Sequence, residues 1–317
     1  MRIVFCGSGE VAVATLEAVR AARHDIVSVI TQPPHKAGRG AHLTPTPVDL
    51  RAAELDLPVV RCPGINLPEH ESVIRQLSPR LIVVVDFGQK IGLAVRDIPP
   101  LGAINMHASL LPELRGAAPI NWAVIRGLRR TGVTTFQLVD RMDSGPIYLA
   151  DSLDIGPEET AEELRARLAG LGADMVLRTI AGLDAGGLQP RPQDPSKVTL
   201  APKLTKADGR IEFADSAFSL ANRIRGVWPW PGAHAEFVRA GRGPVSVLLS
   251  KARALPDGPA IKAAVGEVTA DSCIQTGQGR LEILEIQVAG KRLMTWRDFV
   301  NGYHVAAGDR FVAPGAP

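Results

Sequence analysis

Short apolar runs alternate with amphipathic segments over the first 150 residues, and this alternation limits the possible folds more than any other feature of the chain. The run at 81–85 is continuously apolar, which is typical of a strand buried on both faces of a sheet. The segment 11–22 places its apolar residues at helical spacing, and a further strand is predicted at 103–107. Strands that alternate with helices favour an α/β domain with a doubly wound, mainly parallel sheet.

The pattern changes in the second half of the chain. A capping box at Thr160 and Glu163 predicts the start of a long helix, because each side chain satisfies a free backbone N–H of the other residue. A polar, Pro-rich stretch from 189 follows this helix and is typical of a linker. From 235 onward, short strands with Gly and Pro turns between them predict a small β-barrel.

Composition and charge narrow the functional classes. No apolar run reaches the ~18 residues that cross a bilayer, and the N-terminus lacks the pattern of a signal or transit peptide. The three cysteines are too scattered for a metal site or a disulfide framework, which favours a cytoplasmic protein without a metal. Residues 203–317 contain 15 Lys and Arg against 11 Asp and Glu, so this part either binds a polyanion or simply has a soluble surface.

The first turn of the chain looks like part of a dinucleotide-binding motif. Gly7, Gly9 and Ala12 match the loose fingerprint that follows a first strand. The full fingerprint also needs an acid at the end of the second strand to hold a ribose, and Thr31-Gln32 stands there instead. We therefore predict a tight strand-to-helix turn and no NAD(P).

Two polar residues mark the end of the strand predicted at 103–107. Asn105 and His107 are two residues apart, so both side chains leave the same face of an extended segment. Acyl transfer to an amine needs a donor for the developing oxyanion and a base for the amine proton, which these two groups supply. Asp143 follows in a Gly- and Pro-containing turn and is suited to orient or charge-balance the imidazole. The alternative is a set of hydrogen-bonded core residues, but ligands of α/β sheets bind where strands end.

A long loop at 33–47 separates a predicted strand from a predicted helix. It is rich in Gly and Pro and carries Lys36, Arg39 and His42. Most such loops are solvated connections, yet long loops in compact domains are often functional. Its cations are suited to contact phosphate groups.

Several motifs occur along nearly the whole chain in a consistent order. They are Thr31-Gln32-Pro33, Ala37-Gly-Arg-Gly40, Asn105-Met-His-Ala-Ser-Leu-Leu-Pro112, Arg115-Gly-Ala-Ala-Pro119, Met142-Asp-Ser-Gly145, Asn222-Arg-Ile-Arg225, Trp228-Pro-Trp-Pro-Gly232, Ala289-Gly-Lys-Arg-Leu-Met294 and Asp298-Phe-Val-Asn-Gly302. With these motifs the chain resembles the methionyl-tRNA formyltransferases, a branch of the folate-dependent formyltransferase family.

The resemblance implies transfer of a formyl group from 10-formyltetrahydrofolate to the amino group of methionine on initiator tRNA, in the cytoplasm and without a metal or a membrane. It implies a Rossmann-like catalytic domain at 1–188, a linker at 189–207 and an OB-like tRNA-binding barrel at 208–317. Nothing in the sequence demands more than a monomer.

The resemblance also implies residue roles. Asn105, His107 and Asp143 are the implied catalytic residues. The implied folate contacts are Ser109, Leu110, Leu111 and Pro112, with Phe87, Gly88, Gln89 and Ile91 around the pterin. The implied tRNA contacts are Lys36, Arg39, His42, Arg223, Arg225, Lys291 and Arg292.

Some positions depart from the family pattern. Ser8-Gly9 replaces a usual Thr-Pro, and Asp86 adds a carboxylate near the pterin pocket. Two other functions remain open at this point: a non-catalytic RNA-binding protein that uses the barrel and the basic loop, and a related formyltransferase that acts on an amino sugar or on a nucleotide amine. The intact Asn105, His107 and Asp143 argue against the first, since RNA binding does not need them.

Overall fold

The computed structural model describes residues 1–37, 42–256 and 263–315, which form two compact units. The first unit comprises residues 1–117, 131–153 and 165–201; the second comprises 118–130, 154–164 and the chain from 202 onward. Two stretches of the predicted N-terminal domain thus pack with the C-terminal part, and most of the predicted linker belongs to the first unit. Compact units can exchange segments in this way because packing, not chain order, decides which segments form a core.

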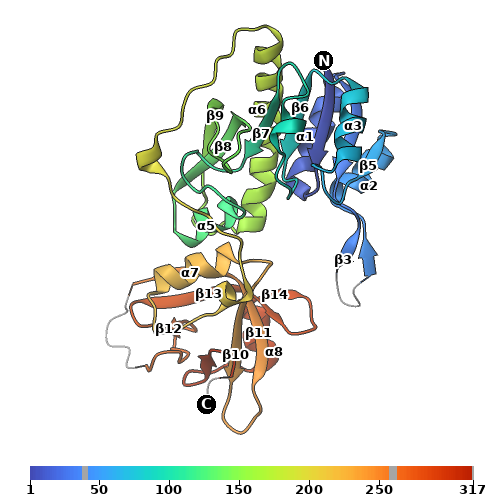
Figure 1. Cartoon of the computed structure of the whole chain (residues 1–317). Coiled ribbons are helices and arrows are strands. Elements are labelled where there is room, and N and C mark those ends of the chain that lie inside the picture. Colours follow the sequence, from blue (N-terminus) through green and yellow to red (C-terminus); the bar gives the residue numbers. More distant parts are fainter. Residues whose placement is uncertain (38–41, 257–262, 316–317) are drawn as a thin grey trace. The chain divides into compact units, whose positions relative to one another are not determined.

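A seven-stranded sheet forms the centre of the first unit (Figure 1). Its strand order is β5-β2-β1-β6-β7-β8-β9. The strands are β1 (Arg2–Gly7), β2 (Asp25–Thr31), β5 (Val59–Arg61), β6 (Leu81–Val85), β7 (Ala103–His107), β8 (Arg130–Gln137) and β9 (Ile147–Asp154). The pairs from β5 to β7 are parallel, which confirms the predicted sheet, whereas β8 runs antiparallel to β7.

The strand order reverses between β1 and β6, which creates a switch point at the carboxyl ends of these strands. From β1 the chain moves through β2 to β5, and it then returns to the other side of β1 with β6 and β7. The connecting helices are α1 (Glu10–Ala21), α2 (Pro47–Glu54), α3 (Pro68–Leu77) and α4 (Leu93–Arg96). Ligands of open α/β sheets bind at such a switch point, so a binding site is expected at the turns after β1, β6 and β7.

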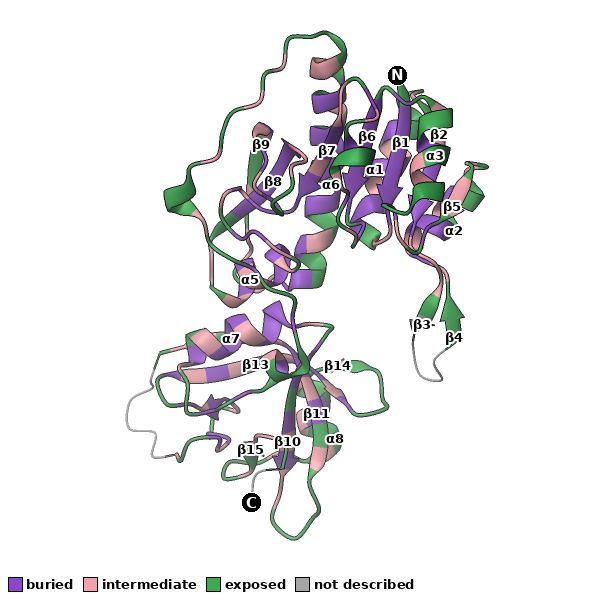
Figure 2. Cartoon of the chain, in the orientation of Figure 1, coloured by how far each residue is buried: buried purple, intermediate pink, exposed green. Residues whose placement is uncertain are grey.

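Burial follows the sheet closely (Figure 2). All five residues of β6 are buried, as the continuous apolar run predicts. The long predicted loop contains a short antiparallel hairpin of β3 (His35–Ala37) and β4 (His42–Thr44). The helix α6 (Ala161–Asp184) begins with the predicted capping box, in which the Thr160 N–H donates to Glu163 and the Glu163 N–H donates to the Thr160 hydroxyl.

The second unit contains the predicted small barrel. Its antiparallel strands have the order β12-β13-β11-β10-β15, and β14 pairs with β13. The strands are β10 (Ala233–Val238), β11 (Val245–Leu255), β12 (Ile274–Gln275), β13 (Arg280–Val288), β14 (Leu293–Thr295) and β15 (Arg310–Val312). Bridges from Glu267 to Arg310 and from Val268 to Ile274 link β15 back to β12, so residues 267–268 close the sheet into a near-barrel.

The second unit includes the helices α5 (Pro119–Ile125), α7 (Ala217–Gly226) and α8 (Trp296–Tyr303). The barrel interior holds an aromatic cluster in which Phe237 lies 5.4 Å from Phe299 and 5.2 Å from Phe311 between ring centroids. Single-turn 3₁₀ helices at Pro195–Lys197 and Lys206–Gly209 complete the regular structure. In the three described ranges, no helix combines the length and the apolar character needed to span a membrane.

Candidate active site

The last residues of β7 carry the two side chains that the sequence singles out. Asn105 pairs in register with Val84 of β6 and Phe136 of β8, and His107 pairs with Thr134 of β8. Both residues therefore lie on one face of a central strand, at its carboxyl end. Asn105 is half-buried and His107 is buried.

His107 is held by a main-chain carbonyl. Its Nε2 lies 2.9 Å from the carbonyl oxygen of Leu114, and because a carbonyl can only accept, Nε2 carries the proton. In the neutral ring Nδ1 is therefore the basic atom, and it faces Oδ2 of Asp143 at 3.9 Å. That distance is too long for a hydrogen bond, yet it places a carboxylate beside the ring when Nδ1 takes up a proton.

Asp143 lies in the loop between β8 and β9 and is fixed by the main chain around it. The N–H of Gly116 donates to Oδ2 of Asp143 at 2.8 Å. The residue has φ of 50°, in the left-handed region that non-glycine residues rarely occupy. The structure thus brings together His107 and Asp143, which lie 36 positions apart in the sequence, on the face of β7 that also carries Asn105.

The turn after β7 holds four of the predicted folate contacts, Ser109 to Pro112. Ser109 is fully buried, and its hydroxyl donates to the carbonyl of Glu113 at 2.6 Å. Its own carbonyl accepts from the hydroxyl of Thr134. Ser109 therefore stabilises the turn, and its contact with folate stays a prediction. Leu111 is buried, whereas Leu110 and Pro112 are partly exposed and remain candidates for folate contact.

The predicted pterin wall follows β6 at the switch point. Phe87 and Ile91 are buried in the core of the first unit, and Gly88 is exposed with φ of 76°. The side chain of Gln89 is used internally: it donates to the carbonyl of Cys62 and accepts from the N–H of Ile65. Gln89 thus supports the segment around the predicted pocket through these two bonds. The sequence could not distinguish such a supporting residue from one that contacts the pterin directly.

The unusual Asp86 lies at the junction of β1 and β6. Its carbonyl accepts from the N–H groups of Ser8 and Gly9, both at 3.1 Å. A Cβ at position 9 would come within 1.8 Å of the Asp86 carboxylate, so Gly9 provides the space that this side chain occupies. Although Asp86 keeps an exposed side, desolvation raises the pKa of its carboxyl, an effect that Arg165 opposes.

The predicted tRNA contacts fall in different environments. Arg39 lies outside the described residues, and for Lys36 only the backbone of β3 is described. His42 is exposed at the start of β4. In the second unit Lys291 and Arg292 are exposed, with the Lys291 ammonium 5.5 Å from the centre of the Tyr303 ring. The half-buried Arg223 donates to the carbonyl of Asp208.

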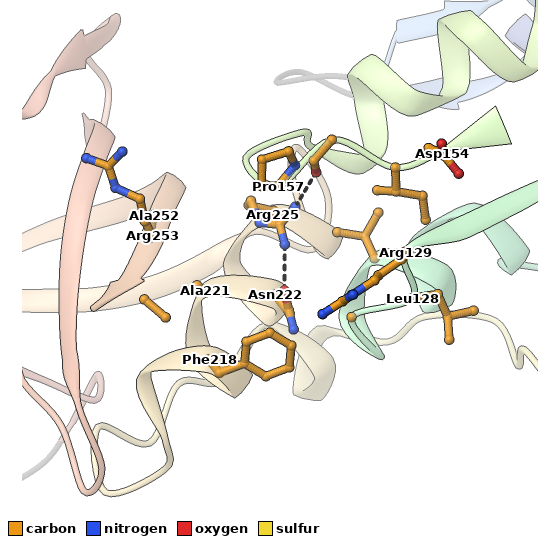
Figure 3. A pocket seen from close by; sticks show the side chains of 15 residues that line it. Leu128, Arg129, Asp154, Pro157, Phe218, Ala221, Asn222, Arg225, Ala252 and Arg253 are labelled. Atoms are coloured by element: carbon orange, nitrogen blue, oxygen red, sulfur yellow. Dashed lines mark hydrogen bonds between the residues drawn. The ribbon is translucent and has the colours of Figure 1, made fainter. Parts of the chain in front are cut away.

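Arg225 is a predicted tRNA contact that the structure places in a buried position. It is only 6% exposed, and its guanidinium donates to the carbonyl of Glu159 at 2.8 Å and to Oδ1 of Asn222. Figure 3 shows it in the wall of a pocket of about 620 Å³ within the second unit, with dashed lines from its guanidinium to the carbonyl of Gly156 and to Oδ1 of Asn222. Burial lowers the pKa of Arg225, while Glu158 and Glu159 favour its charged form. The residue joins 154–164 to α7, and its hydrogen bonds are made within the protein.

We expect Arg225→Ala to lower the free energy of unfolding by about 2 kcal/mol, because it leaves buried carbonyl groups without a donor. Affinity of the folded variant for tRNA should change little. Arg242 is exposed, and Arg242→Ala removes one positive charge as Arg225→Ala does, so it is the control for the effect of net charge on tRNA affinity. Urea denaturation and a tRNA-binding assay measure both effects; a normal unfolding curve with a large loss of tRNA affinity would restore the RNA-binding role.

Sequence reasoning missed two residues of this site. Arg115 is buried near Asp143, and its guanidinium donates a hydrogen bond to Oε1 of Gln193. Arg115 belongs to one of the motifs that carry the family resemblance, and this motif could have marked it as a functional residue. Gln193 lies in the Pro-rich stretch interpreted as a linker, where neither periodicity nor spacing marks it. Among the described residues, no cluster of His, Cys, Asp and Glu suitable for a metal ion occurs.

Comparison with known protein families agrees with this geometry. The family described as "Formyl transferase" matches residues 1–180, and "Formyl transferase, C-terminal domain" matches residues 203–304. The methionyl-tRNA formyltransferase of Solibacter usitatus is 44% identical over 313 residues, which is 98% of each chain. That of Koribacter versatilis is 42% identical over 98% of each chain.

Solved structures share the fold at low identity. An N-formyltransferase from Helicobacter canadensis, in complex with folinic acid and dTDP-3-aminofucose, has a TM-score of 0.64 at 15% identity and covers 92% of this chain and 100% of its own. HypX from Aquifex aeolicus, in complex with tetrahydrofolic acid, has a TM-score of 0.61 at 17% identity over 96% of this chain. The present chain spans 47% of the length of HypX, so this similarity concerns the fold alone.

Proposed function

Because the chain belongs to the methionyl-tRNA formyltransferase family, we propose that Asn105, His107 and Asp143 carry the reaction of that family. The enzyme transfers the formyl group of 10-formyltetrahydrofolate to the free amino group of methionyl initiator tRNA, which supplies N-formylmethionyl-tRNA for translation initiation. The observation that supports the residue assignment is His107, held through Nε2 by Leu114, with Nδ1 facing Asp143 on the strand that carries Asn105.

Each of the three residues has a distinct task in this proposal. Asn105 donates a hydrogen bond to the oxyanion that develops on the formyl oxygen. His107 takes up the proton that the attacking amine releases as its nitrogen bonds to the formyl carbon, and it returns a proton to the departing folate nitrogen as the old C–N bond breaks. Asp143 stabilises the imidazolium between these two events, because its carboxylate lies 3.9 Å from Nδ1.

The binding surfaces are also proposals. The folate is expected beside the turns after β6 and β7, with Phe87, Gly88 and Leu110 near it. We assign the chemistry to residues 1–188 and tRNA binding to 208–317, together with the basic segment 33–47, whose sequence includes Lys36, Arg39 and His42. We further infer a monomeric, cytoplasmic enzyme.

The double variant Lys291→Ala with Arg292→Ala should raise KM for tRNA and leave KM for the folate unchanged. Both side chains are exposed, and each tRNA phosphate that the variant no longer neutralises should reduce the slope of log affinity against log salt by about 1. Titration of tRNA affinity against salt measures this slope. An unchanged slope would place the tRNA elsewhere; Arg297→Ala on the exposed side of α8 is the matched control.

The function itself is tested by changing the acceptor. Purified protein is supplied with 10-formyltetrahydrofolate and, in separate reactions, methionyl initiator tRNA, a nucleotide amine or an amino sugar. Transfer should be fastest to the charged tRNA by several orders of magnitude. Faster transfer to either small amine would assign the chain to a different branch of the family, and absence of transfer to all three would favour a non-catalytic RNA-binding protein.

A further inference from the structure

The segment 189–201 contacts the loop of Asp143 and the turn of Leu114, the residue that accepts from His107. Arg191 pairs with Ile147 at the start of β9, and both main-chain bonds are short, at 2.7 and 2.8 Å. Farther along, the N–H of Ala201 donates to the carbonyl of Arg115 at 2.7 Å. A stretch that the composition marks as a connection is therefore fixed at both ends to the loops that carry the catalytic groups.

Gln193 holds the Asp143 loop through its amide nitrogen. Nε2 of Gln193 donates to the carbonyl of Asp143 at 2.9 Å and to the carbonyl of Gly145 at 2.8 Å. The left-handed backbone of Asp143 is unfavourable by itself, so it persists because surrounding contacts impose it. These two hydrogen bonds and the bond from Gly116 to the carboxylate all hold this part of the loop.

Arg115 fixes the orientation of the Gln193 amide. Its Nη2 and Nε donate to Oε1 of Gln193 at 2.6 and 3.2 Å. Because a guanidinium can only donate, Oε1 must face Arg115 and Nε2 must face the two carbonyls. Arg115 is 8% exposed and Gln193 is half-buried, so the guanidinium that orients the amide is itself held within the protein.

Thr199 holds the other partner of the imidazole. The carbonyl that accepts from His107 belongs to Leu114, which also has a left-handed backbone, with φ of 56°. The N–H of Leu114 donates to the hydroxyl of Thr199 at 2.9 Å, and the N–H of Arg115 donates to the carbonyl of Thr199 at 2.9 Å. Thr199 thus fixes the peptide that determines which ring nitrogen of His107 carries the proton.

We propose that Gln193 and Thr199 are positioning residues for formyl transfer: Gln193 sets Asp143, and Thr199 sets Leu114 and through it the tautomer and orientation of His107. The inference rests on the catalytic roles proposed above for His107 and Asp143. Neither residue touches substrate in this account. Both act on the rate, because small displacements of a base or of its charge partner cost large factors in kcat.

The sharpest variants are Gln193→Glu and Thr199→Val. Glu keeps an acceptor for Arg115 but removes the donor to the Asp143 and Gly145 carbonyls; Val keeps the shape of Thr but removes the hydroxyl. Each should lower kcat by on the order of 10-fold to 100-fold, with KM for the folate and for tRNA within about twofold of the parent. Thr199→Ser retains the hydroxyl and should restore kcat. Lys197→Ala, exposed on the same segment, is the control and should leave kcat unchanged.

The pH profile of kcat and a double variant separate positioning from folding. In a folded variant the profile should shift, since the environment of the imidazole has changed. In a His107→Ala background, Gln193→Glu should lower kcat no further, because it acts through the pair. The inference is overturned if folded Gln193→Glu and Thr199→Val have normal kcat. It is also overturned if the variants have lowered thermal stability but normal kcat at temperatures below their melting temperature. Full activity of His107→Ala would instead contradict the proposed function.

Discussion

Replacing His107 with alanine is expected to lower kcat for formyl transfer by on the order of 10²–10⁴-fold, which is the usual contribution of a positioned general base. The structure leaves Nδ1 of His107 as its proton acceptor, because Nε2 donates to the carbonyl of Leu114. Removal of the ring leaves Asp143 without the cation that it stabilises. Formylation of charged initiator tRNA, followed at saturating concentrations of both substrates, measures the loss.

The interpretation of that loss requires a folded protein. His107 is buried, so alanine also creates a small cavity and leaves the Leu114 carbonyl without its donor. His107→Asn supplies a side-chain N–H donor for the Leu114 carbonyl but no base, so it should be more stable than the alanine variant and equally inactive. Circular dichroism and thermal melting of both variants provide the control. If the asparagine variant were folded and fully active, the base would have to be another group.

Local patterns were sufficient to predict the elements that position the site. The uninterrupted apolar run at 81–85 predicted β6, and the capping box at Thr160 predicted the start of α6. Asn105 and His107 were recognised because polar side chains two residues apart at the end of a central strand require partners or a function. Such signals depend on a few neighbouring residues, and these can be interpreted without knowing the fold.

Features set by distant contacts could not be predicted in the same way. The antiparallel direction of β8 leaves no trace in its composition, because β-branched residues suit both kinds of pair. Arg225 was interpreted as a surface cation because most arginines are exposed, yet α7 turns it toward the carbonyl of Glu159, 66 positions earlier. Gln193 and Thr199 lie in a polar stretch, and only the approach of the Asp143 and Leu114 loops gives them partners.

Asp86 shows how a departure from a family pattern can be explained physically. The sequence indicated an extra carboxylate near the pterin pocket, and the structure places that carboxylate over Gly9 at the junction of β1 and β6. The two departures are therefore linked, because any side chain at position 9 would overlap the Asp86 carboxylate.

Asn105→Asp is the second variant with a large expected effect, and it isolates hydrogen-bond donation from shape. Asn105 is half-buried on β7, two residues before His107 at the carboxyl end of the strand. Aspartate has nearly the same size but presents an acceptor and a negative charge to the developing oxyanion. By comparison with other oxyanion donors, kcat should fall by at least 10²–10³-fold, equivalent to about 3–4 kcal/mol of transition-state stabilisation.

A comparison of Asn105→Asp with Asn105→Ala and with the parent completes this test. Alanine removes the donor without adding charge, so it should lose less activity than aspartate and should leave KM for both substrates nearly unchanged. Asn105 is half-buried on β7, and neither substitution removes a main-chain hydrogen bond of the sheet, so thermal melting should change little. Equal and near-normal kcat for both variants would exclude a donor function for Asn105, because a group that stabilises only the transition state must lower kcat when it is removed.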